Sequence, residues 1–241
     1  MSCSSVKTVT ISDGIEFIED GAFAKCNKLE NVIFPATLKR IGSIGKRERS
    51  YNIFDSCSRG AFESCALKNV ILPENLTYLG EYSFSYCRSL KSIDIPNGVT
   101  TIQDCTFNHC SALKMVRLPE KLKIIGIRAF CECNGLSKIQ FPLALEEIGS
   151  GAFLKCGFVS LVLNEGLKKI GSQAFKDCYE LKEIVLPSTL EKIDSSGSMV
   201  FDSIFGFNSN LIVYCYSGTY GLEYARKNNL TVRNASSYSG I

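Results

Sequence analysis

Twelve cysteines are the residues of this chain with the most potential for chemistry. Seven of them follow a phenylalanine by three residues in a repeated unit: Cys26, Cys65, Cys87, Cys110, Cys133, Cys156 and Cys178. Disulfides need Cα atoms about 4.4–6.8 Å apart with converging side chains, and metal sites usually need closely paired cysteines. Stacked repeats would hold these side chains parallel, and the sequence contains no Cys-x-x-Cys.

We therefore expect the seven cysteines to be reduced, buried packing groups, with a disulfide as the alternative. Four further cysteines lie outside this column, and we expect them to be more exposed: Cys57, Cys105, Cys131 and Cys215.

His109 is the only histidine, two residues after a repeated phenylalanine. A single histidine without a glycine-rich phosphate loop leaves general-base, triad and zinc-hydrolase schemes without partners. The sequence therefore predicts a surface position for His109, no catalytic residue, no metal and no cofactor; the chain is not expected to be an enzyme.

The composition excludes several kinds of partner. The chain has 241 residues, 45% of them apolar and 21% charged, with a net charge of +3. Nucleic-acid-binding domains are usually more basic, so no nucleic acid is expected. No apolar run approaches the roughly 18 residues of a membrane span, and no signal peptide follows Met1 because the apolar stretch of one is missing. We therefore expect no membrane insertion by this chain.

The phenylalanines define the repeat. They are Phe23, Phe62, Phe84, Phe107, Phe130, Phe153, Phe175 and, more loosely, Phe205. Most steps are 22 or 23 residues; steps of 39 and 30 residues place insertions near residues 43–59 and 194–204. The first insertion contains Lys46-Arg47-Glu48-Arg49. It is either a protruding contact loop or a tolerated surface insertion.

Each unit reads Leu-x-x-Ile-x-Leu-Pro-x-x-Leu-x-x-Ile-Gly-x-x-Ala-Phe-x-x-Cys. The alternating Ile-x-Leu predicts a short strand with two inward side chains, which proline then ends. Gly-x-x-Ala-Phe predicts a turn or one helical turn that places an aromatic ring in the interior. One unit cannot bury its apolar face, whereas stacked units form a continuous core. The fold class predicted is a leucine-rich-repeat solenoid of about 8 repeats, a single domain over 1–241 with short parallel strands, turns and short helical turns.

The two ends of the chain differ. Residues 3–11 match residues 26–34 position for position, so we expect further repeats upstream of Met1. Near the other end, residues 211–214 predict a final strand. Ser217-Gly218-Thr219 can cap a short helix over 220–227, and Asn228-Asn229 predicts its end. These features predict a C-terminal helical cap at about 205–233.

One outward residue per strand lines a common face, because side chains alternate along a strand. These residues, after Thr10, are Ile33, Ile71, Asp94, Arg117, Gln140, Val162 and Val185. Solenoids bind partners through such extended faces, and an exposed apolar row marks contact surfaces. The alternative is that β-branched residues are simply good strand formers. We take these residues as the candidate partner-binding site.

The repeated motif and the ending from Val213 to Leu230 resemble the BspA-like leucine-rich repeats. The Asn ladder of ribonuclease-inhibitor repeats is absent; Thr37, Gly98 and Ala144 are among the residues in its place. Members of the BspA-like family are typically surface proteins implicated in adhesion, without catalytic residues. The resemblance implies a protein-interaction module at the cell surface or secreted, binding a host matrix or cell-surface protein. The alternative is a structural spacer or intracellular scaffold without its own ligand.

Overall fold

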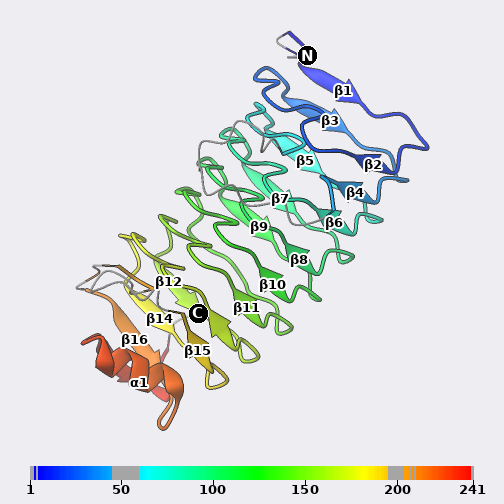
Figure 1. The fold of residues 1–241 in the computed structure, drawn as a ribbon. Helices are drawn as coiled ribbons and strands as arrows, with labels where there is room; N and C mark the ends of the chain where they lie inside the picture. Colours follow the sequence, from blue (N-terminus) through cyan, green and yellow to red (C-terminus); the bar gives the residue numbers. More distant parts are fainter. Residues whose placement is uncertain are drawn as a thin grey trace.

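The computed structural model describes residues 3, 5–44, 60–194, 204–206, 208 and 210–239. It shows a solenoid of about nine turns that runs from the N-terminal to the C-terminal end without a break in direction (Figure 1). Most of both predicted insertions, including Lys46-Arg47-Glu48-Arg49 and Cys57, lies outside the described residues.

The predicted strands form one side of the solenoid. Each is three residues long, and all but the first bury the middle side chain, as the alternation predicts; Val9 in the first strand is half-buried. They are β1 (Thr8–Thr10), β3 (Asn31–Ile33), β5 (Asn69–Ile71), β7 (Ser92–Asp94), β9 (Met115–Arg117), β12 (Ser160–Val162) and β14 (Glu183–Val185). Two four-residue strands continue the row, β16 (Ile212–Cys215) and β17 (Thr231–Asn234). The strands pair in parallel and in register within three groups, β1 with β3, β5 to β9, and β12 to β17, so that Asp94 lies beside Arg117. The backbone at residues 138–140 does not form a strand.

A second sheet, which the sequence analysis does not predict, contains eight parallel strands of two residues each. They are β2 (Phe17–Ile18), β4 (Arg40–Ile41), β6 (Tyr78–Leu79), β8 (Thr101–Ile102), β10 (Ile124–Ile125), β11 (Glu147–Ile148), β13 (Lys169–Ile170) and β15 (Lys192–Ile193). The second residue of each is apolar and buried. The glycine that often follows permits close stacking: a Cβ on Gly171 would lie 2.3 Å from the Ser150 amide nitrogen.

The segment around each phenylalanine is a turn, one of the two predicted alternatives. Its backbone alternates into the left-handed region, with φ of 56° at Cys105 and 59° at His109. The amides of Cys105, Phe107 and His109 all donate to carbonyls of the following turn, at 2.7–2.9 Å. Left-handed backbone is costly for residues other than glycine. Here a third ladder of hydrogen bonds between turns, beside the two sheets, holds the residues in that conformation.

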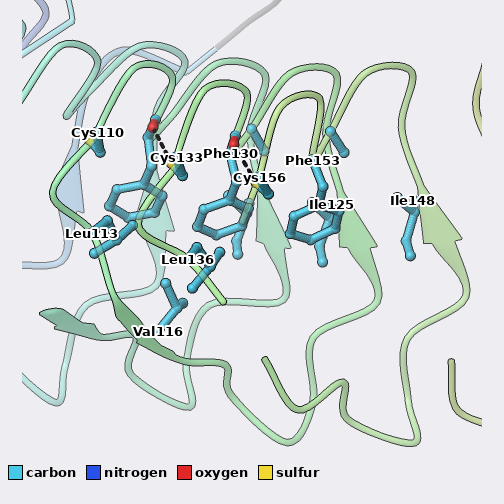
Figure 2. Packing of buried hydrophobic residues seen from close by; sticks show 14 of the residues in the cluster. Cys110, Leu113, Val116, Ile125, Phe130, Cys133, Leu136, Ile148, Phe153 and Cys156 are labelled. Carbon is cyan, nitrogen blue, oxygen red and sulfur yellow. Dashed lines mark hydrogen bonds between the residues drawn. The ribbon is translucent and has the colours of Figure 1, made fainter. Parts of the chain in front are cut away.

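The phenylalanines and the cysteine column form the centre of the core. Rings from Phe62 to Phe175 stack at centroid distances of 5.3–5.7 Å. Figure 2 shows Phe130 and Phe153 in this stack, with Cys133 and Cys156 beside them. The Cys133 thiol donates to the Phe107 carbonyl of the preceding turn at 3.2 Å. The cysteines on either side of Cys133 in the column make the same bond. The predicted burial of the column is confirmed, and its cysteines are free thiols.

The predicted exposure of the other cysteines is wrong for the three that the structure describes. Cys105, Cys131 and Cys215 are all buried. Cys105 and Cys131 flank a core phenylalanine within the third ladder, where the neighbouring turns cover their side chains. Cys215 ends β16 at the inward position that Leu186 occupies after β14.

The C-terminal helix agrees with its prediction. Helix α1 (Tyr220–Lys227) begins after Thr219, whose hydroxyl accepts from the Leu222 amide, and Asn229 has the expected left-handed φ of 54°. Ala225 faces the core and is fully buried. The ordered chain continues beyond the predicted cap through β17 and a short 3₁₀ helix, η1 (Ala235–Ser237).

Candidate functional site

The outward side chains of the three-residue strands form the strand-lined face, which we define as the first and third residues of each strand in that row. Four of the predicted site residues are exposed on it, one per turn: Ile33, Ile71, Asp94 and Arg117. Gln140 is exposed at the corresponding position of the turn that forms no strand, and we include it in the face. Ile71 is 86% exposed and Ile33 is 57% exposed. Because the strands pair in parallel and in register, the structure places Ile71, Asp94 and Arg117 side by side.

The same face is closed at its C-terminal end, so the exposure predicted for Val185 is wrong. Val185 is buried and Val162 is half-buried. Both pack in a small apolar cluster with Tyr214, Ala235 and Tyr238. The Tyr238 ring meets the Tyr214 ring edge-on at 4.8 Å. The chain after β17 thus lies over this part of the face, and the apolar residues there serve intramolecular packing.

The tail contact predicts the effect of Tyr238→Ala. Removing the ring uncovers Val185 and Tyr214, so the variant should bind a hydrophobic dye such as ANS more strongly than the parent chain. The repeats do not depend on this contact, and we expect the melting temperature of the solenoid to fall only slightly. Tyr179→Ala, which removes a tyrosine that is 75% exposed, is the control. Equal dye binding by the Tyr238 variant and the parent would contradict a tail that covers the face.

The open part of the face contains a hollow of about 550 Å³ across β5, β7 and β9. The hollow lies at the ends of these strands and includes the turns that follow them. Of the predicted residues it contains Ile71, Asp94 and Arg117. The side chains that line it with them include Asn69, Glu74, Ser92, Asn97 and Glu120.

The charges around the hollow are not paired internally. Glu74, Asp94, Glu120 and Arg117 form no ion pair with another described residue. One hydrogen bond links two turns at the hollow: the Glu120 amide donates to the Asn97 side-chain oxygen at 3.4 Å. Unpaired, exposed charges keep their full interaction with an incoming partner.

The sequence analysis missed several residues of this face. Met115 begins β9 and is 64% exposed. Lys91 and Lys114, each one residue before a strand, are exposed at the opposite side of the face from Glu74 and Glu120. Lys91 and Lys114 recur one residue before a strand, and Glu74 and Glu120 recur one residue after a proline. This regular spacing could have indicated them from the sequence.

Other reactive groups do not form a second site. Burial raises the pKa of Cys133 well above its usual value, which disfavours the nucleophilic thiolate. His109 is half-buried rather than freely exposed, stacked on Tyr86 and 2.9 Å from Glu132, and burial lowers its pKa. Within the described ranges, no three His, Cys, Asp or Glu residues are placed to hold a metal ion. No helix of the same residues is long and apolar enough to cross a membrane.

Solved structures resemble this solenoid along most of its length. A leucine-rich cell surface protein from Faecalibacterium prausnitzii is 24% identical, with a TM-score of 0.56 over 99% of this chain and 65% of that one. A leucine-rich repeat protein of T. pallidum is 28% identical, with a TM-score of 0.55 over 70% and 86%. The pneumococcal vaccine antigen PcpA is 20% identical, with a TM-score of 0.52 over 95% and 67%. This chain thus spans 65% of the length of the first protein.

The repeat itself decides the family. No curated protein matches the chain. The family model of the BspA type leucine-rich repeat region, however, matches residues 1–45, 55–178 and 112–203 in six copies. These matches cover most of the sequence and follow the repeated phenylalanines and cysteines that build the core. The chain therefore belongs to the BspA type leucine-rich repeat family.

Proposed function

We propose that this chain is a protein-interaction module whose partner contacts the open part of the strand-lined face, from Ile33 to Gln140. The observation that carries the proposal is the hollow beside Ile71, an apolar side chain 86% exposed among unpaired charges. An exposed apolar residue within a polar rim is typical of contact surfaces. Solenoids present such surfaces over many turns.

The partner we propose is a host matrix or cell-surface protein, bound in an adhesion-type contact at the cell surface. The name of the F. prausnitzii neighbour, a cell surface protein, and that of PcpA, a vaccine antigen, support this location. Repeats of this family serve as interaction modules, and its members are typically non-enzymatic. The contact residues in this proposal are Ile33, Ile71, Asp94, Arg117 and Gln140. Val162 and Val185 are not among them, because the first is half-buried and the second is buried.

The test is binding of the purified chain to a panel of immobilised extracellular-matrix proteins. Ile33→Asp or Ile71→Ser should weaken binding at least about tenfold, roughly 1.4 kcal/mol, because each removes an exposed apolar side chain from the contact surface. Both residues are exposed, so neither variant should unfold the chain. Surface plasmon resonance measures the affinity, and circular dichroism verifies the fold.

Matched controls lie on other faces. Ile124→Asp changes an exposed isoleucine of the second sheet, and Arg226→Glu changes an exposed arginine of α1. Both should bind like the parent chain. Unchanged affinity in the Ile33 and Ile71 variants would eliminate this face as the site. Absence of binding to the whole panel would instead favour the spacer alternative.

A further inference from the structure

We propose that the strand-lined face selects an extended polypeptide segment of about six residues that is acidic at one end, apolar in its middle and basic at the other. This inference rests on the proposed function, since it names the chemistry of the partner. We call Glu74, Asp94 and Glu120 the acidic hollow, and Lys91 and Lys114 the lysine edge.

The acidic hollow favours a basic group. Its three carboxylates face one guanidinium, that of Arg117, and none of the four forms an ion pair with another described residue. A cationic side chain would therefore gain attraction without having to displace an internal partner. The hollow, about 550 Å³, has room for a side chain of this size.

The lysine edge favours an acidic group. Lys91 and Lys114 are exposed and form no ion pair with another described residue. Lys68, on the preceding turn of the same column, differs because Glu30 neutralises it at 2.7 Å. Lys91 and Lys114 thus add unpaired positive charge on the turns of β7 and β9, which also carry the hollow; Lys7 and Lys182, exposed in the same column, lie on turns outside it.

Two of the six outward residues of β5, β7 and β9 are apolar. Ile71 and Met115 are 86% and 64% exposed and lie on β5 and β9, on either side of β7. Six residues separate Lys114 from Glu120 along one turn. At about 3.3 Å per extended residue this is roughly 20 Å, the reach of about six residues of a partner segment.

The arrangement of opposite charges excludes simpler partners. A polyanion would be attracted to the lysine edge but repelled by the acidic hollow, and a purely basic segment would meet the reverse conflict. Only a segment with separated charges satisfies both edges at once. Such electrostatic complementarity gives specificity and orientation rather than high affinity.

The test uses a labelled eight-residue peptide, acetyl-Glu-Glu-Ser-Leu-Ser-Leu-Lys-Lys-amide, with the full chain. Its control, acetyl-Glu-Lys-Ser-Leu-Ser-Leu-Glu-Lys-amide, has the same composition but no charge separation. Fluorescence anisotropy at low salt should give at least tenfold tighter binding of the first peptide. The preference should shrink in 0.5 M salt, because surface charges are then screened. Replacing both leucines by serine should weaken binding of either peptide.

Variants of the face supply the decisive comparison. The double variants Glu74→Lys with Glu120→Lys, and Lys91→Glu with Lys114→Glu, should each abolish the preference for the separated peptide. Combining all four changes should restore it, because the edges then exchange signs and the peptide binds in the opposite direction. All four residues are exposed, so circular dichroism should show an unchanged fold.

Three results would overturn the proposal: equal affinity for the two peptides, no detectable binding of either, or a preference that survives both double variants. Each is distinguishable from failure of the proposed function. Matrix proteins could still bind the parent chain and lose affinity for the Ile33→Asp variant, which would retain the face as the site while rejecting this partner chemistry.

Discussion

Replacing Phe107 by alanine is expected to lower the free energy of unfolding by about 3–5 kcal/mol, the usual cost for a buried phenylalanine. The ring is fully buried and lies between those of Phe84 and Phe130, at centroid distances of 5.7 and 5.3 Å. Its removal leaves a cavity within a continuous stack. The backbone there is held by hydrogen bonds to the next turn, so the site cannot readily collapse to fill the space.

Equilibrium urea unfolding followed by circular dichroism measures this loss. Phe23→Ala is the matched control, because Phe23 stacks on one side only, against Phe62, and is partly exposed. It should cost clearly less than Phe107→Ala. Similar stability of the Phe107 variant and the parent chain would contradict the buried ring stack.

The ring stack was predictable because a solenoid repeats one environment in every turn. A residue type that recurs at a fixed spacing, as phenylalanine and cysteine do, must fill equivalent positions in the core. The same argument gave the three-residue strands, whose alternation marks the middle residue as inward. Helix α1 was predictable for a different reason: Thr219 and Asn229 are local signals of its beginning and end.

Other features left no such signal. The strands of the second sheet have two residues each, too few for alternation to be recognised. The left-handed positions of the third ladder hold Cys105, His109 and other residues that rarely adopt this backbone. Only hydrogen bonds between turns select that conformation. Cys105 and Cys131 were misjudged for this reason, since their burial comes from neighbouring turns.

The candidate site likewise has features that the sequence predicts and features that it does not. The column of outward residues follows from alternation, and the structure agrees from Ile33 to Gln140. The cover over Val185 does not follow, because Tyr238 reaches it from a part of the chain beyond the repeats. Nor does the hollow, which combines strand residues such as Asp94 with turn residues such as Glu120.

The buried thiols predict a steep loss of stability in alkaline solution. Burial raises the pKa of Cys87, Cys110, Cys133 and Cys156 well above the usual value near 9. The unfolded chain releases these four protons near pH 9, whereas the folded chain retains them. Above that pH the unfolded state therefore binds fewer protons, and the free energy of unfolding falls as pH rises. Below about pH 8 the contribution of the thiols is fully present.

The expected size follows from the number of thiols. Each group whose proton is lost only on unfolding removes up to about 1.4 kcal/mol per pH unit, so these four alone should remove about 4 kcal/mol between pH 9 and 10. Cys65 and Cys178, whose pKa burial raises to about 12, add to this loss. Urea unfolding at several pH values in reducing buffer measures this slope. Cys133→Ala deletes one such thiol and should reduce the loss between pH 9 and 10 by about 1 kcal/mol, whatever its effect on absolute stability. A free energy of unfolding that stays constant from pH 8 to 10 would mean that the folded thiols ionise as readily as the unfolded ones. It would thereby contradict a buried column in which each thiol donates a hydrogen bond to the phenylalanine carbonyl of the preceding turn.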